Sequence, residues 1–196
     1  MGNNESNKII NENDKIYNQI ENSKEEDNEI IIELEIKMYN VLTPYETYIL
    51  CNKNDLEKNM NKSKKFCCFN KYNTKLYLND KEIEFKYKLK FNEIGINKIK
   101  VKSNLNLISL SSMFYNCSNI INIKFIKFNT NNVTDMNNMF LGCIKLSELN
   151  LSSFNTNNVT DMNNIFLGCV NLDLIKINKL YIKKFKEIID ISKLKI

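Results

Sequence analysis

The sequence contains no histidine, arginine, alanine or tryptophan, and its 196 residues include one proline and four glycines. Histidine is the commonest general base and metal ligand, so its absence removes the usual centre of an acid–base or metal site. The glycines Gly2, Gly95, Gly142 and Gly168 are too scattered to form a phosphate-binding loop. We therefore expect a protein that is not an enzyme, with no catalytic residue, metal or cofactor.

The sequence also lacks long apolar runs and the arginine residues through which many proteins contact DNA bases. No stretch reaches the roughly 18 apolar residues of a membrane span, so the sequence predicts no transmembrane helix. All 28 basic residues are lysine and leave a net charge of +5, whereas reading of DNA bases leans on arginine. The N-terminus lacks the apolar core of a secretory signal. We therefore expect a cytoplasmic protein that does not bind nucleic acid.

Sixteen residues recur almost unchanged. FNTNNVTDMNNMFLGC covers 128–143, FNTNNVTDMNNIFLGC covers 154–169, and the one difference places Ile165 where Met139 stood. An L-x-x-L-x-L spacing of apolar residues follows each copy. A fixed period of 26 residues is typical of a stacked repeat array. The predicted units are 103–128, 129–154 and 155–180.

Within each unit, the spacing predicts one short helix and one short strand. Val133, Met136, Met139 and Phe140 are spaced so that they share one face of a helix, which Asn132 would cap. The L-x-x-L-x-L segment would form the strand, with its apolar residues directed inward and the intervening residues outward.

The block NTNNVTDMNNMFLGC, followed by L-x-x-L-x-L and SSF, resembles the BspA-like leucine-rich repeat, also called the bacterial surface protein 26-residue repeat. The resemblance covers 103–180, although in unit one NLISL at 106–110 replaces the NVTDM segment. It implies a short right-handed leucine-rich-repeat solenoid with a binding or surface role and no catalytic residue.

The segments that flank the repeats differ in composition. Residues 1–28 read as a disordered acidic tail. Residues 29–102 contain alternating apolar and charged residues, most clearly at 30–38 and 83–91, and predict a mainly antiparallel β domain that caps the first coil. An apolar stripe in 181–196 predicts a C-terminal cap helix. The predicted fold class is therefore α+β.

The outward strand positions of the three units form the candidate protein-binding surface. These positions are Asn122, Lys124, Ile126, Glu148, Asn150, Ser152, Leu174, Lys176 and Asn178. Their mixed chemistry suits a protein partner, so we predict a non-enzymatic protein-interaction module whose partner is unknown. The alternatives are a cell-surface adhesin exported by a non-classical route and a truncated paralogue without specific function.

Three further features carry predictions of their own. The N-terminal MGNNES matches the myristoylation pattern, which makes Gly2 a candidate lipidation site for transient membrane contact. Asp135 and Asp161 occupy equivalent places in successive units. We expect their carboxylates to accept hydrogen bonds in turns, rather than to bind Ca²⁺ together.

The three repeat cysteines, Cys117, Cys143 and Cys169, are expected to stack as reduced, buried thiols, with a disulfide as the alternative.

Overall fold

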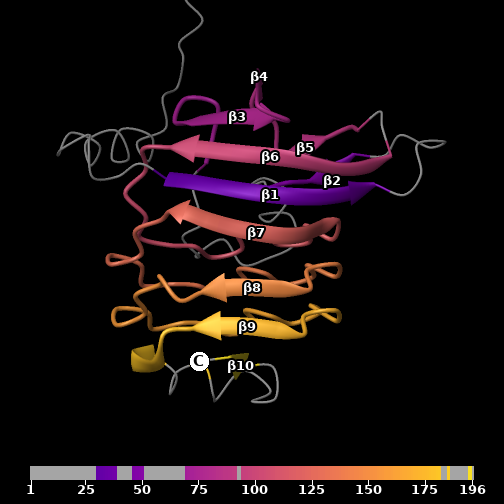
Figure 1. Ribbon diagram of the computed structural model, residues 1–196. Coiled ribbons are helices and arrows are strands. Elements are labelled where there is room, and N and C mark those ends of the chain that lie inside the picture. Colours follow the sequence, from indigo (N-terminus) through magenta and orange to yellow (C-terminus); the bar gives the residue numbers. More distant parts are fainter. Residues whose placement is uncertain are drawn as a thin grey trace, which may run out of the picture.

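The computed structural model describes residues 30–38, 46–50, 69–91, 94–181, 185 and 194–195. The predicted acidic tail, including Gly2, lies outside these ranges, as does most of the predicted C-terminal helix. Apart from one 3₁₀ helix, η1 (Lys179–Tyr181), every element in the described ranges is a strand (Figure 1).

Two sheets follow one another down the molecule (Figure 1). The first is antiparallel, has the order β4-β3-β6-β1-β7, and contains β1 (Ile30–Met38), β3 (Thr74–Leu78), β4 (Lys81–Ile83), β6 (Gly95–Ser103) and β7 (Ile120–Lys127). The second is parallel, has the order β10-β9-β8, and contains β8 (Glu148–Leu151), β9 (Leu174–Ile177) and β10 (Leu194–Lys195). A separate ribbon pairs β2 (Thr47–Tyr48) with β5 (Lys88–Leu89).

Alternation of apolar and charged residues explains the centre of the first sheet. Leu34 in β1 is fully buried and pairs with the equally buried Ile99 in β6. The neighbouring pair, Glu33 and Lys100, lies on the opposite face, with Lys100 Nζ 3.7 Å from Glu33 Oε1. One face therefore packs inward and the other meets solvent, as period-two patterning requires. The strand predicted over 30–38 is confirmed.

The single long strand predicted over 83–91 is wrong. Its residues divide between β4, which pairs with β3, and β5, which pairs with β2. Between them the chain leaves the sheet, and the Tyr87 hydroxyl donates a hydrogen bond to the Phe69 carbonyl oxygen at 2.7 Å. The Phe85 and Tyr87 rings meet edge to face at 4.9 Å. Alternation alone does not reveal that a strand changes partner partway along.

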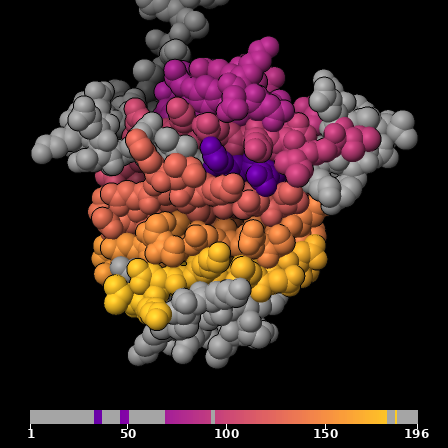
Figure 2. Space-filling view, viewed as in Figure 1, coloured from indigo at the N-terminus to yellow at the C-terminus, as the bar shows by residue number. Residues whose placement is uncertain are grey.

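Each predicted unit forms one coil: coil one is 103–128, coil two is 129–154 and coil three is 155–180. Successive coils stack with a 26-residue offset. Leu149 in β8 pairs with Ile175 in β9, and an isolated parallel bridge joins Asp135 to Asp161. The Phe114, Phe140 and Phe166 rings form a column with 5.7 Å between successive centroids. Equivalent rings thus lie above one another. The coils form layers, which Figure 2 shows as orange and yellow bands.

The helix predicted in each coil is absent, because residues 104–178 contain only strands, bridges and turns. Asn138 and Asn164 have φ angles of +57° and +55°, whereas an α-helix requires about −63°. The apolar residues of the predicted helix, Val133, Met136, Met139 and Phe140, are nevertheless all buried. Asn132 caps no helix, and its side-chain amide instead donates to Asn106 Oδ1 at 3.2 Å.

Hydrogen bonds between coils replace the helical ones. In coil two, four alternate N–H groups donate to carbonyl oxygens of coil three at 2.8 to 3.0 Å: Met136 to Asp161, Asn138 to Asn163, Phe140 to Ile165 and Gly142 to Leu167. The N–H groups of Met139, Leu141 and Cys143, each one residue after one of these donors, close turns onto carbonyl oxygens three residues earlier. The α+β assignment and the helix-plus-strand leucine-rich-repeat solenoid are therefore wrong, since the described fold is nearly all strand and turn.

Both ends of the repeat region also differ from the prediction. Leu194 and Lys195, expected in a cap helix, form β10 and pair in parallel with Ile175 and Lys176 of β9. At the other end, β7 belongs to predicted unit one yet pairs with β1. The antiparallel sheet therefore extends across the predicted boundary at residue 102.

Candidate functional site

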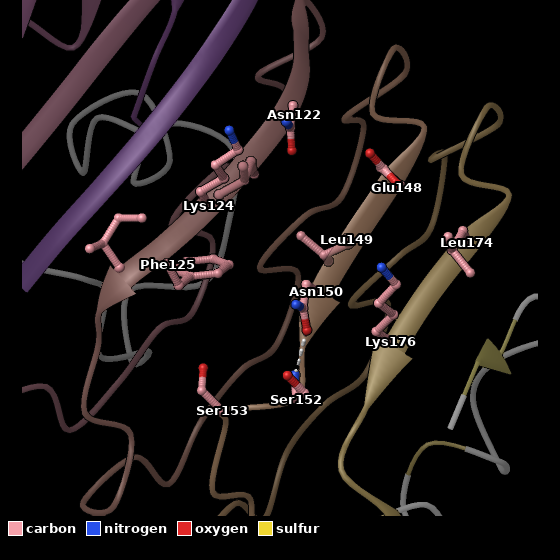
Figure 3. Close-up of a pocket in the computed structure, with 12 residues that line it drawn as sticks. Asn122, Lys124, Phe125, Glu148, Leu149, Asn150, Ser152, Ser153, Leu174 and Lys176 are labelled. Atoms are coloured by element: carbon pink, nitrogen blue, oxygen red, sulfur yellow. Dashed lines mark hydrogen bonds between the residues drawn. The ribbon is translucent and has the colours of Figure 1, made fainter.

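A groove of about 490 Å³ crosses the outward face of β7, β8 and β9 (Figure 3). Eight of the nine predicted binding residues line it: Asn122, Lys124, Ile126, Glu148, Asn150, Ser152, Leu174 and Lys176. The sequence pattern thus brings together residues that are up to 54 positions apart, from Asn122 to Lys176, on one surface.

The parallel pairing of β8 and β9 determines how the groove residues are arranged. Glu148 lies opposite Leu174, and Asn150 lies opposite Lys176. Glu148, Asn150 and Lys176 are exposed and Leu174 is half-buried, while the residues between them face the interior. Asn150 Oδ1 also accepts the N–H of Ser152 at 3.0 Å and turns the chain at the end of β8.

The third strand of the groove, β7, belongs to the other sheet. Its pairing with β1 contains register shifts between Ile31 and Ile32 and between Glu35 and Ile36, and β7 and β8 belong to different sheets in the described ranges. Lys124 and Ile126 are exposed, whereas Asn122 is half-buried, with its amide nitrogen 3.5 Å from Glu35 Oε2. The groove therefore lies at the junction of two sheets.

Phe125 is a groove residue that the sequence analysis assigned to the interior. It is half-buried, lines the groove, and packs its ring 4.7 Å from that of Phe128 and 4.8 Å from that of Phe154. Ser153 also lines the groove and was not predicted. The available signal for Phe125 was an aromatic residue where the other two units have Leu151 and Ile177.

The charged groups of the groove are Lys124, Glu148 and Lys176. The ion pairs found among the described residues involve none of these three side chains. The three charges, together with the exposed apolar side chain of Ile126, are therefore available to a binding partner.

The ninth predicted residue, Asn178, lies outside the groove. It is half-buried, and its Oδ1 accepts the N–H of Leu180 at 3.0 Å. This bond begins η1, so Asn178 has a local structural use where the chain leaves β9.

The aspartates at equivalent places of successive coils form turn hydrogen bonds. Asp135 Oδ1 accepts the N–H of Asn137 at 2.8 Å, and Asp161 Oδ1 accepts that of Asn163 at 2.9 Å. Asn137 also places its amide nitrogen 3.4 Å from Asp161 Oδ1. Within the described ranges, no three acidic or cysteine side chains gather closely enough to hold a metal ion.

The three repeat cysteines are buried, and their thiols are reduced. The Cys143 thiol donates to the Phe114 carbonyl oxygen at 3.1 Å, and the Cys169 thiol donates to that of Phe140 at 3.0 Å. Burial raises the pKa of Cys143 well above its ordinary value; the nearby Cys169 raises it further, and a backbone hydrogen bond from Cys117 lowers it. A buried, protonated thiol is a core residue and a poor nucleophile.

Two predictions concern membranes. Among the described residues, no helix combines the length and apolar character needed to cross a bilayer. The candidate lipidation site Gly2 lies outside those residues and stays a prediction.

Comparison with protein families gives a match over more than half of the chain. The sequence profile of the family described as "Mycoplasma protein of unknown function, DUF285" matches residues 81–193. This is a different family from the BspA-like leucine-rich repeat, so the resemblance inferred from the repeat block is wrong. The comparisons with curated proteins and with solved structures found no match.

Proposed function

The chain belongs to the DUF285 family, and we propose that it is a non-enzymatic protein-interaction module that binds a partner protein through the groove across β7, β8 and β9. One observation carries this proposal. Outward residues of three strands, separated by whole repeats in the sequence, line a single groove whose charged groups have no ion-pair partner among the described residues.

The chemistry of the groove indicates what the partner brings. Lys124 and Lys176 favour carboxylates, and Glu148 favours one cationic or amide group. Ile126, which is 55% exposed, offers an apolar contact beside them. Protein surfaces supply such mixtures of charged, polar and apolar groups at short range. A polyanion would meet repulsion from Glu148, so a protein partner fits better.

The backbone that carries these side chains is well supported. The inward neighbours Leu149 and Ile175 are 2% and 1% exposed and pack into the core of the coil stack. Side chains on paired strands lose less conformational freedom on binding than side chains on a loose loop. A preorganised groove of this kind suits recognition without a large rearrangement.

The test compares affinity capture by the whole chain with capture by two triple variants. Lys124→Ala, Glu148→Ala and Lys176→Ala together remove the charges of the groove. The matched control, Lys81→Ala, Glu82→Ala and Lys90→Ala, makes the same change of charge at exposed positions outside it.

We expect the groove variant to lose at least about tenfold in affinity for a captured protein, which corresponds to about 1.4 kcal/mol of binding free energy. The control variant should bind like the unaltered chain. Equal binding by both variants would place the interaction elsewhere and contradict the proposal.

A further inference from the structure

The last coil of the stack ends in a row of backbone donors. The N–H groups of Met162, Asn164, Phe166 and Gly168 have no acceptor among the described residues. The equivalent N–H groups of coil two all donate to carbonyl oxygens of coil three, at 2.8 to 3.0 Å. Those of coil one all donate to carbonyl oxygens of coil two, within the same range of distances. The hydrogen-bond pattern that joins the coils therefore continues to the end of the stack and stops there.

The same end is open to solvent. Asn164 and Gly168 are exposed, and Leu167 is 59% exposed. Phe166 is half-buried, whereas Phe140, which stacks on it at 5.7 Å, is fully buried. The aromatic column thus ends with a ring that is covered less than the ring before it.

Among the described residues, the chain adds one strand to the strand half of this coil. β10 adds to β9 in parallel register, with Leu194 opposite Ile175. The row of donors belongs to the turn-built half of the coil, where no comparable addition occurs among the described residues.

The chemistry of the row limits its occupant. The Asp161 carboxylate lies at the start of the row, and the exposed side chains that follow it, such as Asn163 and Leu167, are uncharged. An anion would be repelled by Asp161, whereas peptide carbonyl oxygens match the donors without added charge. In a second copy of this chain, the matching carbonyl oxygens would be those of coil one, which include those of Ser111 and Met113. A folded second copy does not offer these oxygens, because Ser111 and Met113 are 1% and 2% exposed.

We propose that this end is a docking site for another protein chain that adds one further coil of the same 26-residue type. Four alternate carbonyl oxygens of that coil accept the N–H groups of Met162, Asn164, Phe166 and Gly168, and a side-chain ring of the partner stacks on Phe166. The proposed contact repeats the coil-to-coil interface that is already present twice in the molecule. It does not depend on the groove across β7, β8 and β9.

Hydrogen exchange of the whole chain, with and without a synthetic peptide of residues 129–154, tests the proposal. The four amides should exchange freely in the chain alone. At a peptide concentration about ten times its Kd, they should exchange about tenfold more slowly. The amides of Met136, Asn138, Phe140 and Gly142 should be unaffected, because they already donate to coil three. A peptide with alanine in place of Phe140 should bind more weakly, since it lacks the ring that would meet Phe166.

Three results would overturn the proposal. The first is that the four amides of the chain alone are as protected as those of coil two. The second is that the peptide fails to slow their exchange at millimolar concentration. The third is that exchange of the four amides slows when the concentration of the chain is raised without peptide. That result would show that a second copy of the chain occupies the site. The groove variant described above should still bind the peptide, so failure of the groove and failure of this site are distinguishable.

Discussion

The antiparallel sheet and the coil stack satisfy their backbone groups in different ways. In the sheet, β1 lies between β6 and β7, and its pairing with β6 is continuous from Ile30 to Met38. In the stack, β8 and β9 contain only four residues each, and turn residues carry most of the bonds between coils. In the sheet, the alternation of apolar and charged side chains therefore indicates which residues form strands. In the stack, the 26-residue period indicates which residue each backbone group pairs with.

β7 belongs to both regions. Its sequence occupies the first repeat unit, yet its ladder is formed with β1 and contains two register shifts. The groove lies where this edge of the sheet meets β8. The candidate site thus forms where the antiparallel sheet meets the coil stack. Substitutions that perturb only one of these two regions can separate what each contributes to stability.

The largest effect is expected in the interior of the stack. Leu149 is 2% exposed, and Leu149→Ala should lower the free energy of unfolding by about 2–5 kcal/mol, because it leaves a cavity between coils. Its neighbour Glu148 is exposed, and Glu148→Ala should change that free energy by no more than about 0.5 kcal/mol. Urea denaturation measures both, and equal losses would show that the assignment of inward and outward residues is wrong.

A smaller effect is expected where the coils turn. Gly142 and Gly168 have φ angles of +75° and +77°, so alanine at either position should cost about 1–2 kcal/mol of backbone strain. At Gly142 the added Cβ would also collide with the Asn116 side chain, whereas at Gly168 the nearest atoms are at ordinary contact distance. Gly142→Ala should therefore destabilise more than Gly168→Ala, and adding Asn116→Gly should remove the difference. A difference that survives this second substitution would point to another cause.

In the sheet region, a smaller loss of unfolding free energy is expected from one of two tyrosine substitutions. Tyr87→Phe removes the hydroxyl that donates to the Phe69 carbonyl oxygen, and should cost about 0.5–1.5 kcal/mol of unfolding free energy. Tyr72 is 87% exposed, so Tyr72→Phe should cost less than about 0.5 kcal/mol. Thermal unfolding of the two variants would contradict this expectation if both melted at the same temperature.

The smallest effect is a dependence on pH. Because burial raises the pKa of Cys143 in the folded chain, the folded state keeps a proton that the unfolded state loses near pH 9.0. This contribution to stability is complete below that pH and declines as the pH rises above it. The urea midpoint should fall more steeply above pH 9.0 in the unaltered chain than in Cys143→Ala. Parallel slopes would remove Cys143 as the cause.

Sequence patterns anticipated a good part of this architecture. Alternation located β1, and the 26-residue period located the coils and the outward residues Glu148, Asn150 and Lys176. The groove across three strands follows from these two patterns. What no pattern supplied was the pairing of β7 with β1, which is a contact between segments that have no repeat relationship.

The helix prediction failed for a physical reason that the sequence contains. The spacing of Val133, Met136, Met139 and Phe140 places them on one side of either an α-helix or a spiral of turns. The signal that distinguishes the two is the left-handed residue, Asn138, followed four positions later by Gly142. Asparagine and glycine tolerate positive φ better than other residues, and their recurrence in the next copy favours turns over a helix.

The most direct test of the account is nuclear magnetic resonance of the backbone of coils two and three. Chemical shifts and three-bond couplings report φ for each residue. We expect positive φ at Asn138 and Asn164, with turns on either side of each. An uninterrupted run of helical shifts from Val133 to Phe140 would contradict it.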